Sequence, residues 1–250
     1  PKSGELLVLY SNPGFDPNRF TAGMTGAEWQ ELQEHPGNPF LNRALSGIYP
    51  PGSVFKPFTA AAAIAERAID PAARVEITGE EWQPSAAWGD YHVKRVHPEL
   101  KSVDLYEAMK FSDNIYFARA GLALGEKKFL EYGERFGFGE EISFPLPVAR
   151  SRLAREGIKS EIQLADSSYG QGEVMITPLQ LALFYSAFAA GGTIPQPQLF
   201  RAAEPAPWKE NILDPAVVET VHRSLVETLH GADAPGAAGI VPGFTVAGKT

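Results

Sequence analysis

Ser53 and Lys56 are the pair in this sequence best able to form a nucleophile and its base. On a helix, residues three apart share a face, so the serine hydroxyl and the lysine amine can touch. A serine hydroxyl is a weak nucleophile until a base takes its proton, and a desolvated lysine with a lowered pKa can act as that base. Such a spacing also arises by chance about once in a chain of this length. Here Pro50-Pro51-Gly52 would hold the serine at the helix start, where the helix dipole favours developing negative charge.

Two further polar groups could complete a site. Ser112-Asp113-Asn114 lies between two expected helices and by itself is most simply a helix N-cap with spare polar groups. Alternatively, its serine can pass a proton and its asparagine amide can bind a peptide bond. Lys249 and Thr250 end an expected strand, where a cation and a hydroxyl can bind a carboxylate through charge and a hydrogen bond.

Periodicity and turn residues predict that helices position most of these groups. We expect strands at Glu5–Ser11 and Phe244–Thr250, and irregular structure over residues 74–100. The expected helices are Thr25–Glu34, Ser53 to about Ala68, Asp104–Lys110, Asn114–Leu124, Glu126–Phe136, Thr177–Ala190 and Asp214 to about Leu229. Strands at the two ends of a chain commonly pair in one sheet, which predicts an α+β or α/β fold with a helical lobe inserted between them.

Composition excludes several classes of protein. The 250 residues, 44% hydrophobic and 21% charged, suit a globular chain of one or two domains. A net charge of −8 argues against sequence-independent nucleic-acid binding. With no cysteine and no close pair of histidine ligands, we expect neither thiol chemistry nor a metal site. No apolar run reaches the roughly 18–20 residues of a membrane span.

Taken together and in this order, S-x-x-K, S-D-N and the start of K-T-G match the motif set of penicillin-binding proteins and class A β-lactamases. Over essentially all 250 residues the sequence resembles the transpeptidase domain of class B penicillin-binding proteins. The stretches that carry this resemblance are Phe15-Asp16-Pro17-Asn18, Leu41-Asn42-Arg43-Ala44, Tyr49-Pro50-Pro51-Gly52-Ser53, Tyr169-Gly170-Gln171-Gly172-Glu173 and Thr177-Pro178-Leu179-Gln180.

Within that class, the chain most resembles the branch containing the low-affinity transpeptidase responsible for methicillin resistance in staphylococci. The stretches involved are Glu81-Trp82-Gln83, Trp88-Gly89-Asp90-Tyr91, residues 112–119 and the segment that begins at Tyr169.

The resemblance implies a role for each site residue. Ser53 would attack the carbonyl of a D-Ala-D-Ala stem peptide, with Lys56 as general base and Ser112 as proton relay to the leaving D-Ala. Asn114 would bind the substrate amide. The terminal carboxylate would be held by Lys249 and Thr250. Tyr91 and Gln171 resemble positions that line the cleft, although an ordinary surface or packing role suits them equally. No cofactor and no metal are implied.

The resemblance also implies a fold, a location and partners. We expect the penicillin-binding and serine β-lactamase-like transpeptidase fold, with a sheet flanked by helices and an all-helical lobe. Residues 1–250 would form one transpeptidase domain without its last strands and C-terminal helix, because the glycine of K-T-G would follow Thr250. The protein would act outside the bacterial cell membrane, anchored by an N-terminal segment absent from this chain. Its partners would be lipid-linked or nascent peptidoglycan, β-lactam antibiotics as covalent inhibitors, and divisome or elongasome proteins, with no nucleic acid.

Two other functions remain open. A serine β-lactamase or β-lactam sensor shares S-x-x-K and K-T-G, but class D enzymes and sensors usually have Ser-x-Val where this chain has Ser112-Asp113-Asn114. A class A β-lactamase also needs a glutamate-bearing loop to activate water, and the region from Glu156 to Glu161 lacks that context. The other possibility is a catalytically silent penicillin-binding module retained as a scaffold.

Overall fold

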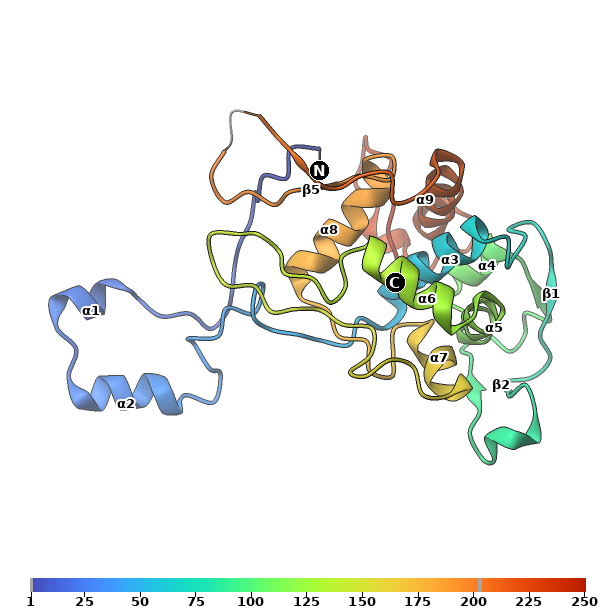
Figure 1. The fold of residues 1–250 in the computed structure, drawn as a ribbon, viewed down its shortest axis with the longest axis horizontal. Helices are drawn as coiled ribbons and strands as arrows, with labels where there is room; N and C mark the ends of the chain where they lie inside the picture. The colour runs from blue at the N-terminus through green and yellow to red at the C-terminus, as the bar shows by residue number, and fades with distance from the viewer. Residues whose placement is uncertain (1, 202–203) are drawn as a thin grey trace.

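The computed structural model describes residues 2–201 and 204–250, and its body is built mainly of helices (Figure 1). Figure 1 shows one pair of helices, α1 and α2, set apart from the group formed by the others. The helices are α1 (Asn18–Ala22), α2 (Gly26–Glu34), α3 (Lys56–Ala65), α4 (Leu105–Lys110), α5 (Asn114–Leu124), α6 (Glu126–Arg135), α7 (Glu161–Ser167), α8 (Pro178–Ala189) and α9 (Pro215–His230).

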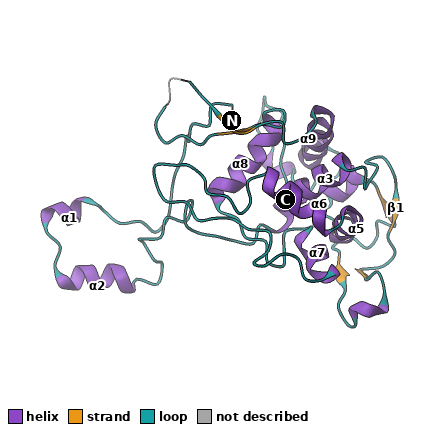
Figure 2. Cartoon of the chain, viewed as in Figure 1, coloured by secondary structure: helices purple, strands orange, loops and turns teal. Residues whose placement is uncertain are grey.

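The strands form short antiparallel pairs rather than one large sheet (Figure 2). They are β1 (Val75–Glu76) with β4 (Ser102–Val103), β2 (Glu81–Trp82) with β3 (Val93–Lys94), and β5 (Ile194–Pro195) with β6 (Pro207–Lys209). Cα partners in these pairs include Val75 with Val103 and Trp82 with Val93. Residues 74–100, which we expected to be irregular, therefore contain three of these short strands.

The expected pairing of the two chain ends in one sheet is wrong for the described residues. Near the start, the Leu6 amide donates to the Gln198 carbonyl, and Glu5 forms a single bridge there. Near the end, residues 244–250 form no strand, and the Gly248 amide donates to the Leu225 carbonyl of α9. A strand requires a neighbouring strand as hydrogen-bond partner. Here the two ends bond to different elements.

Local capping signals predicted the helix starts well. In α2, Thr25 and Glu28 form the expected capping box, and Asp104 caps α4 in the same way. The starts of α8 and α9, each a capping residue followed by proline, are likewise confirmed. The prediction of a continuous helix from Ser53 is wrong, because residues Gly52–Phe55 form a 3₁₀ turn, η1, before α3 begins. The short helices α1 and α7 were not among the helices predicted from the sequence.

Helix α3 lies at the centre of the core, and its composition explains how. Its run of alanines from Ala60 to Ala63 is fully buried, and side chains this small let α5 and α9 approach closely. Phe55 and Phe58 stack with ring centroids 4.6 Å apart and begin an aromatic cluster that continues through Phe129, Phe136, Phe138 and Phe184. Burying each such ring contributes about 1.5–3 kcal/mol. The core thus anchors the end of the turn that carries Ser53 and the helix that follows it.

The segment that contains α1 and α2 has a small aromatic cluster of its own. Phe15, Phe20, Trp29 and Phe40 contact one another edge-on or tilted. Trp29 keeps 42% of its surface exposed, so it is only in part the packing residue that tryptophan usually is.

Candidate active site

The 3₁₀ turn that carries Ser53 is held by contacts from distant parts of the chain. Gly52 has a φ of 59°, a left-handed value that glycine adopts without strain. Its amide donates to the Gly170 carbonyl at 2.8 Å, and the Tyr185 hydroxyl donates to the Val54 carbonyl at 2.9 Å. The stretch around Gly170 therefore supports the turn from one side and α8 supports it from another.

Gly170 allows this support because it has no side chain. A Cβ there would lie 2.0 Å from the Gly52 carbonyl oxygen, and its φ is +83°. We expect Gly170→Ala to destabilise the protein by about 2 kcal/mol or more, since both strain and a backbone clash must be relieved. The thermal midpoint should fall by roughly 4–8 °C, and acylation of Ser53 should slow.

Gly79→Ala is the matched control for this prediction. Gly79 has the same φ of +83°, but an added Cβ would meet nothing within 4 Å. Both variants carry the conformational strain, and only Gly170→Ala adds the clash. Equal losses of thermal midpoint in calorimetry would show that close approach to Gly52 is unimportant.

Lys56 is completely buried and lies among oxygen atoms from both motifs. Its Nζ is 3.1 Å from Ser53 Oγ, 2.8 Å from Ser112 Oγ, 2.7 Å from the Ser112 carbonyl oxygen and 2.7 Å from Asn114 Oδ1. Ser112 Oγ is also 2.9 Å from Ser53 Oγ. The two hydroxyls and the amine thus form a closed triangle of hydrogen-bond distances.

The number of acceptors around Lys56 indicates how a neutral amine would be arranged. The Ser112 carbonyl and Asn114 Oδ1 can only accept, so they take the two hydrogens of a neutral amine. The nitrogen lone pair then remains for a hydroxyl, and both serine hydroxyls are within reach. A neutral Lys56 could therefore accept the Ser53 proton directly or through Ser112.

The surroundings of Lys56 favour that neutral form. Burial lowers its pKa well below the usual lysine value, and the positive charge of Lys249 lowers it further, while Asp113 acts in the opposite direction. Burial also lowers the pKa of Lys249, to about 8. Lys56, the candidate base, is thus desolvated, whereas Lys249, the candidate carboxylate-binding group, remains a cation near neutral pH.

The triplet Ser112-Asp113-Asn114 is shaped by its own backbone and by α5. Ser112 has a φ of 57°, an uncommon value for a residue with a side chain. Asp113 is the N-cap of α5 and accepts from the Tyr116 amide, as the N-cap interpretation predicted. Asn114 accepts from Lys56 and donates from Nδ2 to the Lys94 carbonyl at 3.0 Å. The two interpretations of the triplet are compatible, because Asp113 caps the helix while its neighbours face Lys56.

The remaining expected site residues are less closely joined to this cluster. Lys249 Nζ donates to the carbonyl and the hydroxyl of Thr250, which is exposed. The Tyr91 hydroxyl donates to Asp166, which also accepts from Tyr169. Gln171 is exposed, and its backbone N–H donates to the backbone carbonyl of Asp166. Sequence reasoning missed Asp166, whose carboxylate joins the segment containing Tyr91 to the end of α7.

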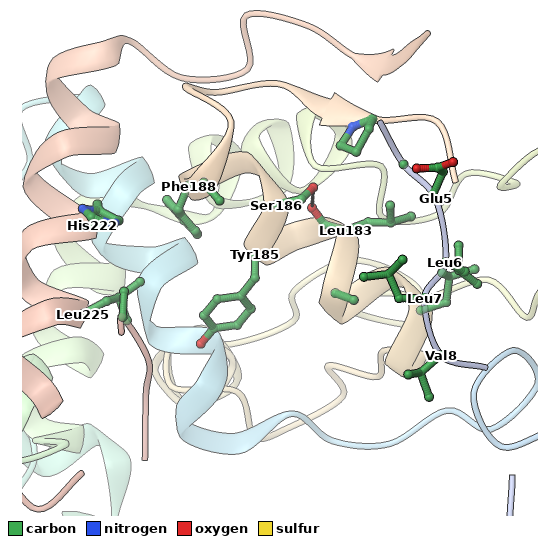
Figure 3. Close-up of a pocket in the computed structure, with 16 residues that line it drawn as sticks. Glu5, Leu6, Leu7, Val8, Leu183, Tyr185, Ser186, Phe188, His222 and Leu225 are labelled. Carbon is green, nitrogen blue, oxygen red and sulfur yellow. Dashed lines mark hydrogen bonds between the residues drawn. The ribbon is translucent and has the colours of Figure 1, made fainter. Parts of the chain in front are cut away.

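A separate apolar pocket of about 520 Å³ lies beside α8 and α9 (Figure 3). Figure 3 shows Leu6, Leu7 and Val8 along one edge, beside Leu183 of α8, with Tyr185 of the same helix farther from that edge. His222 and Leu225 of α9 close the other end. None of Ser53, Lys56, Ser112 or Asn114 lines this pocket, so it is distinct from the site described above.

Comparison with known proteins defines the class of this chain. Residues 1–250 match the family described as the penicillin binding protein transpeptidase domain. The chain therefore belongs to that family, and its fold is the penicillin-binding transpeptidase fold.

Named relatives support this membership. The chain is 35% identical over 252 residues to penicillin-binding protein 3 of Bacillus subtilis (strain 168), an alignment that covers 100% of this chain and 38% of the relative. It is 31% identical over 265 residues to the peptidoglycan D,D-transpeptidase PbpA of Mycobacterium tuberculosis, covering 100% of this chain and 53% of that protein. The chain thus spans about half or less of the length of these relatives.

Solved structures agree with the sequence matches. The ceftriaxone acyl-enzyme complex of penicillin-binding protein A from M. tuberculosis superimposes with a TM-score of 0.87 at 26% identity, over 100% of this chain and 58% of that one. Its imipenem acyl-enzyme complex gives a TM-score of 0.86. Within residues 2–201 and 204–250, no helix has the length and apolar character to cross a bilayer.

Proposed function

We propose that this chain is the catalytic domain of a peptidoglycan D,D-transpeptidase, which forms an acyl-enzyme on Ser53 and is acylated there by β-lactams. The observation that carries the proposal is the hydrogen-bonded triangle of Ser53, Ser112 and the buried Lys56. Relatives named as peptidoglycan D,D-transpeptidases and similar structures titled as β-lactam acyl-enzyme complexes support it.

In the proposed reaction, Lys56 removes the Ser53 proton as Oγ attacks the carbonyl carbon of the penultimate D-Ala. The carbon–nitrogen bond to the terminal D-Ala then breaks. Because Ser112 Oγ lies 2.8 Å from Lys56 Nζ, it can pass the proton from the lysine to the leaving amine. An acceptor amine next attacks the acyl carbonyl and displaces Ser53, which regains its proton. Asn114 has a second N–H that can donate to the substrate amide.

Incubation with a labelled penicillin tests the proposal, because a transpeptidase and a β-lactamase differ in how long they keep the adduct. A stable adduct on Ser53 together with release of D-Ala from a stem peptide supports a transpeptidase. Rapid turnover of the penicillin would indicate a β-lactamase, and the absence of any adduct would indicate a silent scaffold.

We predict a bell-shaped dependence of acylation efficiency on pH, with separate lysines responsible for the two limbs. The rate should rise as Lys56 loses its proton. It should fall above about pH 8, because Lys249, whose pKa burial lowers to about 8, then loses the charge that binds a substrate carboxylate. The measurement is the second-order rate of acylation by a chromogenic cephalosporin from about pH 5.5 to about pH 9.5.

Lys249→Arg separates the two limbs, since arginine stays charged throughout this range. The rising limb should remain and the alkaline fall should disappear. Persistence of that fall with an unchanged midpoint would mean that Lys249 is not the carboxylate-binding cation.

We further propose the finer assignments that the resemblance implies. Residues 1–250 form a single transpeptidase domain, and Thr250, Tyr91 and Gln171 line the substrate cleft with Lys249. The domain belongs to the low-affinity branch and acts on the outer face of the membrane, alongside divisome or elongasome proteins. Acylation measured across penicillins and cephalosporins tests the branch, because a low-affinity enzyme is acylated slowly by all of them.

A further inference from the structure

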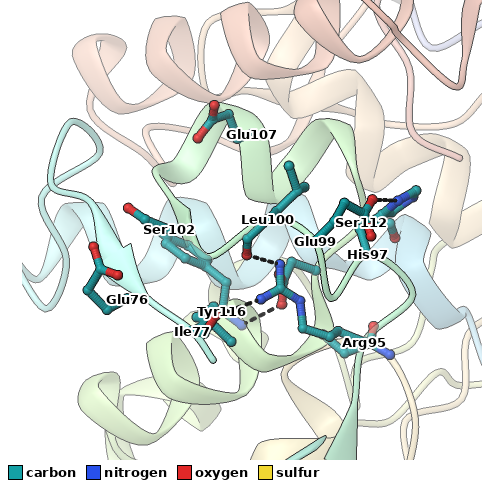
Figure 4. A network of polar contacts seen from close by, with 12 residues as sticks. Glu76, Ile77, Arg95, His97, Glu99, Leu100, Ser102, Glu107, Ser112 and Tyr116 are labelled. Atoms are coloured by element: carbon teal, nitrogen blue, oxygen red, sulfur yellow. Dashed lines mark hydrogen bonds and ion pairs between the residues drawn. The ribbon is translucent and has the colours of Figure 1, made fainter. Parts of the chain in front are cut away.

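A buried ion pair lies directly behind the Ser112-Asp113-Asn114 triplet. Arg95 Nη2 is 2.9 Å from Asp113 Oδ2, and the two side chains are 0% and 2% exposed. The guanidinium also donates to the carbonyl oxygens of Ile77, at 3.2 Å, and Leu100, at 2.7 Å (Figure 4). Arg95 thereby connects the triplet to two points in the segment between β1 and β4.

Such a pair requires an explanation, because removing two charges from water costs more than their attraction usually returns. Asp113 Oδ1 already caps α5 by accepting from the Tyr116 amide. Its Oδ2 accepts no hydrogen bond of regular geometry from the described residues, so the charge of the Arg95 guanidinium, 2.9 Å away, is what compensates it. A neutral asparagine could cap the helix equally well. Helix capping alone does not account for a carboxylate at this position.

Asp113 stands between the two residues that contact Lys56. Ser112 on one side supplies its hydroxyl and carbonyl to Lys56 Nζ, and Asn114 on the other supplies Oδ1. The negative charge of Asp113 is close enough to raise the pKa of Lys56. An uncompensated carboxylate here would therefore favour a protonated lysine and oppose its action as a base.

We propose that Arg95 is a positioning residue of the acylation reaction, which neutralises Asp113 and thereby keeps Lys56 able to accept the Ser53 proton. This inference rests on the proposed function, because it assigns a partner to the proposed base. The Arg95 guanidinium contacts Asp113 and the Ile77 and Leu100 carbonyls, and the side chain is fully buried, so it would act through Asp113.

Several other charged or titratable groups face this network. Burial lowers the pKa of Lys56 most, and the charge of Lys249 lowers it further. The pKa of Glu99 is lowered mainly by a hydrogen bond from its own backbone amide and by its hydrogen bond with His97, and the charge of Arg95 adds to this. The Tyr116 hydroxyl remains protonated, because burial and the charges of Asp104 and Asp70 raise its pKa. Among the charged groups of the described residues, Lys249 and Asp113 shift the pKa of Lys56, and they act in opposite directions.

Two single variants and their combination test the proposal. Arg95→Gln leaves the carboxylate unpaired, so the midpoint of the rising limb of acylation should move up by about one pH unit or more. Acylation at a pH below the midpoint should then be about tenfold slower. Asp113→Asn keeps the helix cap but leaves the charge of Arg95 unpaired, so the midpoint should move to lower pH. The double variant, neutral at both positions, should return close to wild type.

Arg74→Gln is the matched control, since Arg74 also pairs with a carboxylate and a backbone carbonyl but lies half exposed. Its rising limb should be unchanged. A purely structural role for Arg95 predicts that the single variants lower the thermal midpoint without moving their limbs in opposite directions. Unmoved limbs, or limbs displaced the same way, would overturn the proposal.

If Arg95→Gln fails to fold, Asp113→Asn and the double variant still test the proposal. A midpoint of the rising limb that stays in place or moves to higher pH in Asp113→Asn also overturns it. Loss of the proposed function itself is recognised separately, since the wild type would then show no adduct on Ser53 at any pH.

Discussion

Ser53→Ala should abolish covalent labelling by penicillin, while the wild type gains the mass of one penicillin per chain. The reason is that the acyl-enzyme bond forms at the serine oxygen, which alanine lacks. Loss of one half-buried hydroxyl should leave the thermal midpoint within a few degrees of wild type. Intact-protein mass spectrometry followed by peptide mapping measures both the stoichiometry and the position of the adduct.

Geometry alone leaves two candidates for the nucleophile, because both Ser53 and Ser112 lie within hydrogen-bond distance of Lys56 Nζ. Ser112→Ala therefore provides the decisive comparison. It should form the adduct more slowly, and still on Ser53, since only the proton relay is lost. An adduct that maps to Ser112, or one that survives in Ser53→Ala, would reverse the assignment of the two serines.

Lys56→Met should slow acylation by about 10²–10⁴-fold, the usual contribution of a positioned general base. Methionine retains most of the apolar length of lysine in this buried position, so the fold should persist. The rising limb of the pH profile should also disappear, because the group that titrates there has been removed. Stopped-flow acylation and circular dichroism give the rate and the state of folding.

Lys128→Met controls for the change of residue type, since Lys128 is a partly exposed lysine paired with Glu66 and Glu131. Its acylation rate should match wild type. If acylation of folded Lys56→Met stays within about tenfold of wild type, equivalent to about 1.4 kcal/mol in the barrier, then Lys56 is not the base.

Much of the local structure could be predicted because its causes lie within a few residues of chain. The capping box of Thr25 and Glu28 and the proline after Thr177 mark helix starts through hydrogen bonds and backbone angles that neighbouring residues determine. The expected strands at the chain ends were wrong for the opposite reason. A run of β-prone apolar residues shows only that a segment can form a strand, whereas its hydrogen-bond partners come from elsewhere in the fold.

The sequence by itself determined the chemical groups of this protein and their family. Ser53 and Lys56, Ser112 and Asn114, and finally Lys249 occur in an order and local context that identify a penicillin-binding transpeptidase domain before any coordinates are considered. Short spacing also places Lys56 one turn from Ser53, because both lie in the same turn-and-helix unit.

Only the tertiary structure decided how those groups act on one another. Lys56 is a candidate base because it is fully buried and lies beside the charge of Lys249, far away in the chain. Nothing in the sequence distinguishes Arg95 from the other charged residues near it. Its ion pair with Asp113 forms because the end of β3 packs against the start of α5. Burial and charge proximity depend on contacts between distant segments. No spacing along the chain reveals them.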